Sequence, residues 1–167
     1  MKILTLVALA LLMLSSLSAC SDAPHDASET APAPSTEASN PLEGAWELVY
    51  HKAVFPDSTV VQDEGTPFAL KLFTPTHHTY IMRDPEGAFV SAGGGSYTFE
   101  GATFTETHAY QSVPEWVGYM ATWNVRFEQD IFYMTGPTKV VTAQGEDVTE
   151  EILGVLGQLE ETFRRVK

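Results

Sequence analysis

The sequence has only one cysteine and few basic residues. A single cysteine excludes an intrachain disulfide. Nine Lys and Arg residues stand against 22 Asp and Glu residues in a chain of 167, which gives a formal net charge of −13. Without a basic stripe to displace counterions from phosphates, nucleic-acid binding is disfavoured, and so is a membrane contact made through Lys and Arg. Hydrophobic residues make up 44% of the chain, which excludes disorder along its whole length.

The apolar run at residues 3–14 is too short to span a bilayer, but it follows Lys2 and suits the hydrophobic region of a secretory signal. It leads to Leu17-Ser18-Ala19-Cys20, which resembles the lipobox of bacterial lipoproteins. In those proteins the signal is cut before the cysteine, and the thiol carries a diacylglycerol. We therefore expect a lipoprotein signal peptide at 1–19 and a lipid anchor on Cys20. An ordinary signal peptide with a free, buried cysteine is the alternative.

The resemblance to the lipobox also indicates where the protein is located. In Gram-negative lipoproteins the residue after the lipidated cysteine biases sorting, and here it is Ser21 rather than Asp. This favours the outer membrane, with the protein on its periplasmic side, over retention at the inner membrane.

The segment that follows has the composition of a linker. Ala, Pro, Ser and Thr supply 14 of the 20 residues at 21–40, and the segment has no aromatic residue and no β-branched aliphatic residue. Such a segment buries too little surface to offset its ordering entropy, so we expect the lipidated Cys20 and residues up to 40 to form a disordered tether. Residues 41–167 are enough for one domain with a real core.

Alternation of apolar and polar residues with period two recurs through this domain and predicts strands. The predicted strands lie at 42–51, 68–73, 77–83, 89–91, 97–99, 103–110, 119–128, 131–134, 139–142 and 159–166. Aromatic residues that we place on inward faces are Trp46, Tyr50, Phe68, Phe104, Trp123 and Phe127. Many short strands with turns between them predict an antiparallel barrel or sandwich, and a barrel leaves no open edge.

One helix is expected near the C-terminus. Asp147-Val148-Thr149-Glu150 has the pattern of a capping box, and Gly157 can end the helix that it starts. A continuous helix over 147–165 is the alternative, because the apolar residues of this stretch also fit a helical stripe.

Short motifs carry a resemblance to a known family. Gly44-Ala45-Trp46 is similar to the Gly-x-Trp motif of lipocalins and related calycin barrels. There the tryptophan closes one barrel end beneath a basic residue near the last strand, a role that the resemblance gives to Arg164 or its neighbour Arg165. More specific is a succession of short motifs: Lys71-Leu72-Phe73-Thr74, Thr76-His77, Gly93-Gly94-Gly95-Ser96-Tyr97-Thr98, Thr103-Phe104-Thr105-Glu106 and Tyr110.

Over 42–135 and the last strand, the chain thus resembles a lipocalin-like domain family of unknown function, found in envelope proteins and lipoproteins of Bacteroidetes and marine bacteria. The resemblance implies an all-β fold, an up-and-down barrel of about eight strands with one short C-terminal helix. It implies no established reaction.

The strand at 103–110 predicts a site. Phe104, Glu106, His108 and Tyr110 share the face that its aromatic ends mark as inward. A buried carboxylate is costly unless it is paired or protonated, so a neighbouring residue or a ligand must satisfy Glu106. We expect Glu106, His108 and Tyr110 to anchor a small, partly apolar ligand. The remaining predicted contacts are Phe104 and Trp123 on the pocket wall, and His77.

Other readings of this face stay open. The acid–His–Tyr group could simply lock a barrel whose interior is filled, which would make the protein a structural or interaction partner of another envelope protein. Glu106 and His108 could also work as an acid–base pair. His77 or His78 with Glu106 and His108 offers zinc-type ligands, but the spacing matches no metal motif, so we predict no metal and no cofactor. No serine lies in a Gly-x-Ser-x-Gly elbow, and we assign no catalytic residue.

Overall fold

The computed structural model describes residues 40–63 and 68–167. The predicted signal peptide, Cys20 and the tether up to residue 39 lie outside the described residues. The elements, in chain order, are β1 (Gly44–Val54), β2 (Thr59–Asp63), β3 (Ala69–Phe73), β4 (His77–Arg83), β5 (Phe89–Glu100), β6 (Thr103–Thr107), β7 (Tyr110–Gln111), the 3-10 helix η1 (Pro114–Trp116), β8 (Met120–Glu128), β9 (Ile131–Val141), α1 (Thr149–Leu156) and β10 (Gln158–Arg165).

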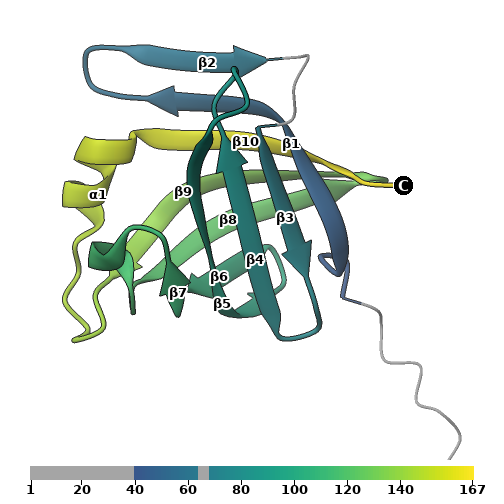
Figure 1. Ribbon diagram of the computed structural model, residues 1–167. Coiled ribbons are helices and arrows are strands. Elements are labelled where there is room, and N and C mark those ends of the chain that lie inside the picture. Colours follow the sequence, from purple (N-terminus) through teal and green to yellow (C-terminus); the bar gives the residue numbers. More distant parts are fainter. Residues whose placement is uncertain (1–39, 64–67) are drawn as a thin grey trace, which may run out of the picture. The chain divides into compact units, whose positions relative to one another are not determined.

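Eight of the strands form a closed antiparallel barrel. Neighbours run in the order β1-β3-β4-β5-β6-β8-β9-β10, and β10 pairs back onto β1. The described chain therefore has the predicted all-β, up-and-down, lipocalin-like barrel with one short C-terminal helix (Figure 1). Two short strands add to it: β2 pairs with the second half of β1, and β7 pairs with β5. In Figure 1 the β1–β2 hairpin projects at the top of the view.

The first strand changes face along its length. Trp46 and Leu48 are buried, and the pairing of β1 with β10 then slips between Leu48 and Tyr50. After this bulge the inward positions belong to His51 and Ala53, so the placement of Tyr50 on the inward face is wrong. A bulge inserts one residue and so reverses the alternation beyond it.

Aromatic side chains fill one part of the barrel. Phe132 meets the edge of Trp46 at 4.8 Å between ring centroids and stacks on Phe163 at 4.5 Å. The guanidinium carbon of Arg165 lies 4.1 Å from the Trp46 ring, and Arg165 donates hydrogen bonds to the carbonyls of Glu43 and Pro41.

The basic residue over Trp46 is therefore Arg165 and not Arg164. Successive residues of β10 face opposite sides, and Arg164 donates to the Glu47 carboxylate on the outer side at 2.8 Å. The positive φ of Gly44 (118°) and the closeness of Arg165, whose Nη1 would lie 2.7 Å from an added Cβ, explain why a glycine precedes Trp46 by two residues.

The C-terminal region is a helix followed by a strand. α1 ends at Gly157, which has φ 74°, and β10 begins at the next residue, so the continuous-helix alternative is wrong. The capping-box prediction also needs correction. The N-cap is Val148, which has no side-chain cap, while the Asp147 carboxylate accepts a hydrogen bond from the Thr149 amide at 3.1 Å. Within the described ranges, no helix has the length and apolar character needed to cross a membrane.

Candidate functional site

The barrel contains a cavity of about 430 Å³ that is partly open to solvent and has mainly apolar walls. Strand residues make most of the wall, and η1 and α1 add Trp116, Ile152 and Leu156. Trp46 and Phe132 do not line it. The cavity therefore lies beside the packed rings of Trp46 and Phe132, and Phe163 borders both.

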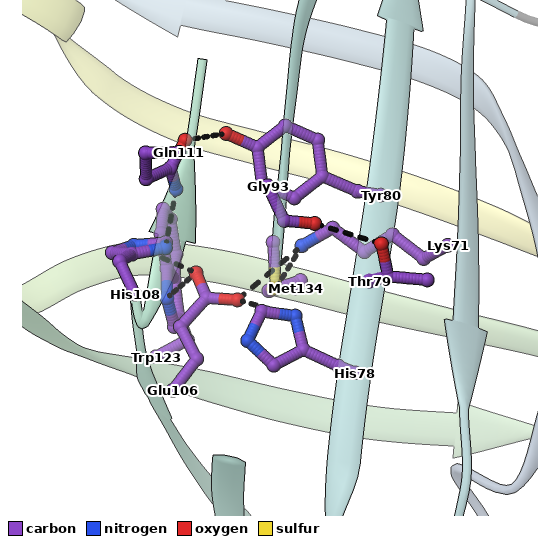
Figure 2. Close-up of polar contacts among 10 residues, drawn as sticks. All are labelled: Lys71, His78, Thr79, Tyr80, Gly93, Glu106, His108, Gln111, Trp123 and Met134. Carbon is purple, nitrogen blue, oxygen red and sulfur yellow. Dashed lines mark hydrogen bonds and ion pairs between the residues drawn. The ribbon is translucent and has the colours of Figure 1, made fainter. Parts of the chain in front are cut away.

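Glu106 is the centre of a polar cluster in this cavity (Figure 2). The residue is only 3% exposed. Its Oε1 accepts a hydrogen bond from Trp123 Nε1 at 3.0 Å and lies 3.8 Å from His108 Nε2. Its Oε2 lies 3.4 Å from His78 Nδ1 and 4.0 Å from Lys71 Nζ. Side chains from β3, β4, β8 and the turn after β6 thus converge on one carboxylate of β6.

The local chain path explains why His108 points inward and Tyr110 does not. β6 ends at Thr107, and the next residue bonds across to the loop before β8, with His108 N donating to Tyr119 O at 2.8 Å. The alternation then breaks, so Tyr110 lies in β7 with 76% of its surface exposed. The prediction that Tyr110 shares the inward face is wrong.

Glycines make this path possible. A Cβ on Gly95 would collide with the backbone carbonyl of Thr107, and one on Gly93 would collide with the Gln111 side chain. The segment after β6 can therefore lie directly against β5, which brings His108 over the cavity. The triple glycine serves this close backbone approach.

A short relay fixes the His108 ring. Tyr80 donates to Gln111 Oε1 at 2.8 Å, and Gln111 Nε2 lies 2.6 Å from His108 Nδ1. Because the amide nitrogen can only donate, Nδ1 is the acceptor and the neutral ring carries its proton on Nε2. That nitrogen faces Glu106 (Figure 2).

The ionisation of the cluster follows from burial and charge. Burial alone would raise the pKa of the Glu106 carboxyl, but the charge of Lys71 and the other partners outweigh it and lower the pKa below its ordinary value. Burial lowers the pKa of His78 to about 4, although the Glu106 charge opposes this. At neutral pH Glu106 is therefore ionised and His78 is neutral.

The cluster is incompletely hydrogen-bonded within the described residues. Glu106 Oε2 and both ring nitrogens of His78 have no hydrogen-bond partner there. Lys71 Nζ contacts the Met134 sulfur at 4.0 Å and lies over the Phe163 ring, 5.3 Å from its centroid. Buried polar groups normally find partners, so such a cluster can take up a polar group of a ligand.

A second ion pair lies on the cavity wall. His51 Nδ1 is 3.1 Å from Glu161 Oε1, and both residues line the cavity. The cavity thus contains two carboxylates and one ammonium group, together with the imidazoles of His51 and His108.

The structure brings together Glu106, His108 and Trp123 of the predicted site residues. Phe104 is buried in the core beside the cavity but does not line it. His77 lies on the outer side of β4, where its Nδ1 is 2.8 Å from Thr76 Oγ1. The structure therefore places neither Phe104 nor His77 on the cavity wall.

Sequence reasoning missed Lys71 and the His51–Glu161 pair. The strand pattern gave no signal for Lys71, because Leu70 and Leu72, the more hydrophobic face of β3, are exposed while Lys71 is buried with Ala69 and Phe73. In the part of the chain that the structure describes, no three His, Cys, Asp or Glu residues are arranged to hold a metal ion.

A closed eight-stranded antiparallel barrel with an internal cavity defines the lipocalin-like class. Among solved structures, the chain is similar to a lipocalin-like protein from Bacteroides uniformis, with 14% identity and a TM-score of 0.46, over 75% of this chain and 98% of the other. It is similar to an uncharacterized protein from Bacteroides eggerthii, with 14% identity and a TM-score of 0.45, over 75% and 99%. No protein-family model and no curated protein matches the chain. These likenesses concern architecture alone.

Proposed function

We propose that this protein is a lipid-anchored binding protein of the bacterial envelope that holds a small, mostly apolar ligand inside its barrel. The observation that carries the proposal is the cavity of about 430 Å³, with apolar walls and the Glu106 cluster inside it. Cavities of roughly 300–1,000 Å³ with a few convergent polar groups are typical of small-molecule sites. A barrel that served only as a scaffold would be expected to fill this space with side chains.

The polar cluster supports binding over acid–base catalysis. A general acid or base works best with a pKa near the operating pH. The pKa of Glu106 is lowered instead, so its carboxylate holds a proton poorly at neutral pH. A fixed, ionised group in an apolar cavity is suited to orienting a ligand.

The proposal also includes a location, which is the periplasmic side of the outer membrane. The lipobox-like Leu17-Ser18-Ala19-Cys20 supports an acyl anchor in the bilayer, and Ser21 supports sorting to the outer membrane on the periplasmic side. The acidic chain supports a domain that stays off anionic lipid rather than spreading on it.

The test is native mass spectrometry of the full chain, purified from its own envelope in a mild detergent. We expect a mass excess on the protein that disappears on denaturation. A chain that carries no such excess, and takes none up from an envelope lipid extract, would contradict the proposal.

Two substitutions on β8 locate the ligand. Ala121 lines the cavity, so Ala121→Phe should fill part of it and abolish the mass excess. Asn124→Phe adds an aromatic ring at an exposed position of the same strand and should leave the mass excess unchanged. Retention of the ligand in folded Ala121→Phe protein would place it outside the barrel.

A further inference from the structure

We propose that the polar end of the cavity selects a ligand with an uncharged head group that both donates and accepts hydrogen bonds, such as an alcohol or a primary amide. The inference rests on the proposed function, since it names the class of ligand for the same cavity. Its basis is the geometry and the charge of the Lys71–Glu106 pair.

The distance between the two charged groups suits one bridging group. Lys71 Nζ and Glu106 Oε2 lie 4.0 Å apart, which is too long for a direct hydrogen bond. An oxygen atom about 2.8 Å from each would fit between them, because two such contacts can span this separation. Both residues line the cavity, so a ligand atom can reach the position from inside.

The bridging group must do two things at once. Lys71 offers only donors, and the ionised Glu106 carboxylate offers only acceptors. Glu106 Oε2 accepts no hydrogen bond from the described residues, and the only hydrogen-bond partner of Lys71 Nζ there is the Met134 sulfur. A hydroxyl or amide group accepts from the ammonium and donates to the carboxylate, whereas an ether or a carboxylate can only accept.

Charge excludes the ionised alternatives. Glu106 already balances Lys71. A ligand carboxylate bound there would be a second anion beside a single ammonium group, and a ligand ammonium would lie against Lys71. Either would lose its hydration without a free counter-charge at this end of the cavity.

The volume and the walls indicate the kind of ligand. A cavity of about 430 Å³ lies in the range of roughly 300–1,000 Å³ that is typical of small-molecule sites. With apolar walls around the Glu106 cluster, this suits a ligand with a polar head on an aliphatic chain.

The experiment compares three probes that share one chain length: 1-decanol, decanoate and decylammonium. Binding to the full chain in lipid nanodiscs is measured by calorimetry near neutral pH, with empty discs as the blank. We expect 1-decanol to bind about tenfold more tightly than either charged probe, as for one charge-assisted hydrogen bond gained without a charge clash. Decanoate or decylammonium binding as tightly as 1-decanol would overturn the inference.

A substitution that removes the charge of Glu106 provides a second test of the same inference. Glu106→Gln leaves the positive charge of Lys71 unbalanced, so the order should invert and decanoate should become the tightest probe. Glu160→Gln is the control, since Glu160 pairs with Lys52 on the outer side of the barrel at 2.8 Å. That variant should keep the wild-type order. A Glu106→Gln protein that still prefers 1-decanol would overturn the inference, whatever its stability.

The outcomes separate the two proposals. If a charged probe binds most tightly and Ala121→Phe abolishes its binding, the head-group inference fails, but the proposed ligand site in the cavity stands. If none of the three probes binds, the inference is overturned, and the mass spectrometry of envelope-purified protein then decides the proposed function.

Discussion

Glu106 and Lys71 form a pair whose members depend on each other inside the barrel. Removing one partner of a buried ion pair leaves an uncompensated charge in a medium of low dielectric. Glu106→Ala should therefore lower the free energy of unfolding by about 3–5 kcal/mol, because Lys71 stays buried without its counter-charge. Urea unfolding followed by tryptophan fluorescence measures the change.

Thr105 provides the matched control on the same strand. Its side chain faces the other side of β6, where its hydroxyl bonds to the Thr122 hydroxyl at 3.2 Å. Thr105→Ala should cost about 1 kcal/mol or less. Equal losses in the two variants would contradict the inward placement of Glu106.

His78 makes the stability of the protein depend on pH. Its pKa is lowered from 6.5 to about 4 by burial, so between these values the unfolded chain binds a proton that the folded chain does not. Stability is therefore unaffected by this group above pH 6.5 and falls as the pH drops from 6.5 toward 4, by about 3 kcal/mol at roughly 1.4 kcal/mol per pKa unit. The lowered pKa of Glu106 acts separately, below the ordinary glutamate value of 4.5.

Urea titrations at a series of pH values test this prediction. His78→Phe should flatten the fall in stability between pH 6.5 and 4, since the ring already packs among Phe73 and Phe104. His77→Phe should keep the fall, because that ring lies outside the barrel. An unchanged fall in His78→Phe would assign it to other groups.

Single residues also show where sequence reasoning reaches its limit. The inward position of Glu106 could be predicted because Phe104 marks the core face two residues earlier. Lys71 could not be predicted as part of the site, since a lysine on a strand ordinarily marks the solvent face and its partner lies on a strand 35 residues away. Long-range charge pairs leave no local pattern.

At the scale of elements, alternation predicts strands well and fails where a strand is interrupted. The bulge in β1 turned Tyr50 outward, and the break after β6 did the same to Tyr110. Both irregularities depend on pairing with distant strands, which the local pattern does not contain. The helix and the closing strand near the C-terminus were separable because Gly157 ends one before the other begins.

The closing strand β10 carries a testable contrast between consecutive arginines. Arg165 covers Trp46 and donates to two backbone carbonyls, so Arg165→Ala should destabilise the barrel by about 2 kcal/mol. Arg164 pairs with Glu47 near the surface, so Arg164→Ala should cost less than about 1 kcal/mol. Thermal unfolding of the two variants, followed by near-ultraviolet circular dichroism of the tryptophans, measures the difference. A larger loss in Arg164→Ala would reverse the assignment of the barrel-closing residue.

At the scale of the whole molecule, barrel closure was predictable because many short strands at close spacing must satisfy their edges. The cavity was not predictable, since the same inward residues could have filled the interior. Whether they do depends on how the side chains of all eight strands pack together, and here β3 and β8 contribute small residues, Ala69 and Ala121, to the wall.

The proposed lipid anchor on Cys20 leads to a prediction that can be tested on the full chain. Each acyl methylene buried in a bilayer contributes about 0.8 kcal/mol, so two or more acyl chains on Cys20 would hold the protein on the membrane against the repulsion between its net charge of −13 and anionic lipid. In a Gram-negative host we expect the wild-type chain to incorporate labelled palmitate and to fractionate with the outer membrane. Cys20→Ser should lose the label and leave that fraction. Ser21→Asp should keep the label and move to the inner membrane, because Asp at this position retains lipoproteins there in the proteins that the lipobox resembles. Wild-type protein that incorporates no labelled palmitate would contradict the lipid anchor. A labelled Ser21→Asp protein that remains in the outer-membrane fraction would contradict only the proposed sorting.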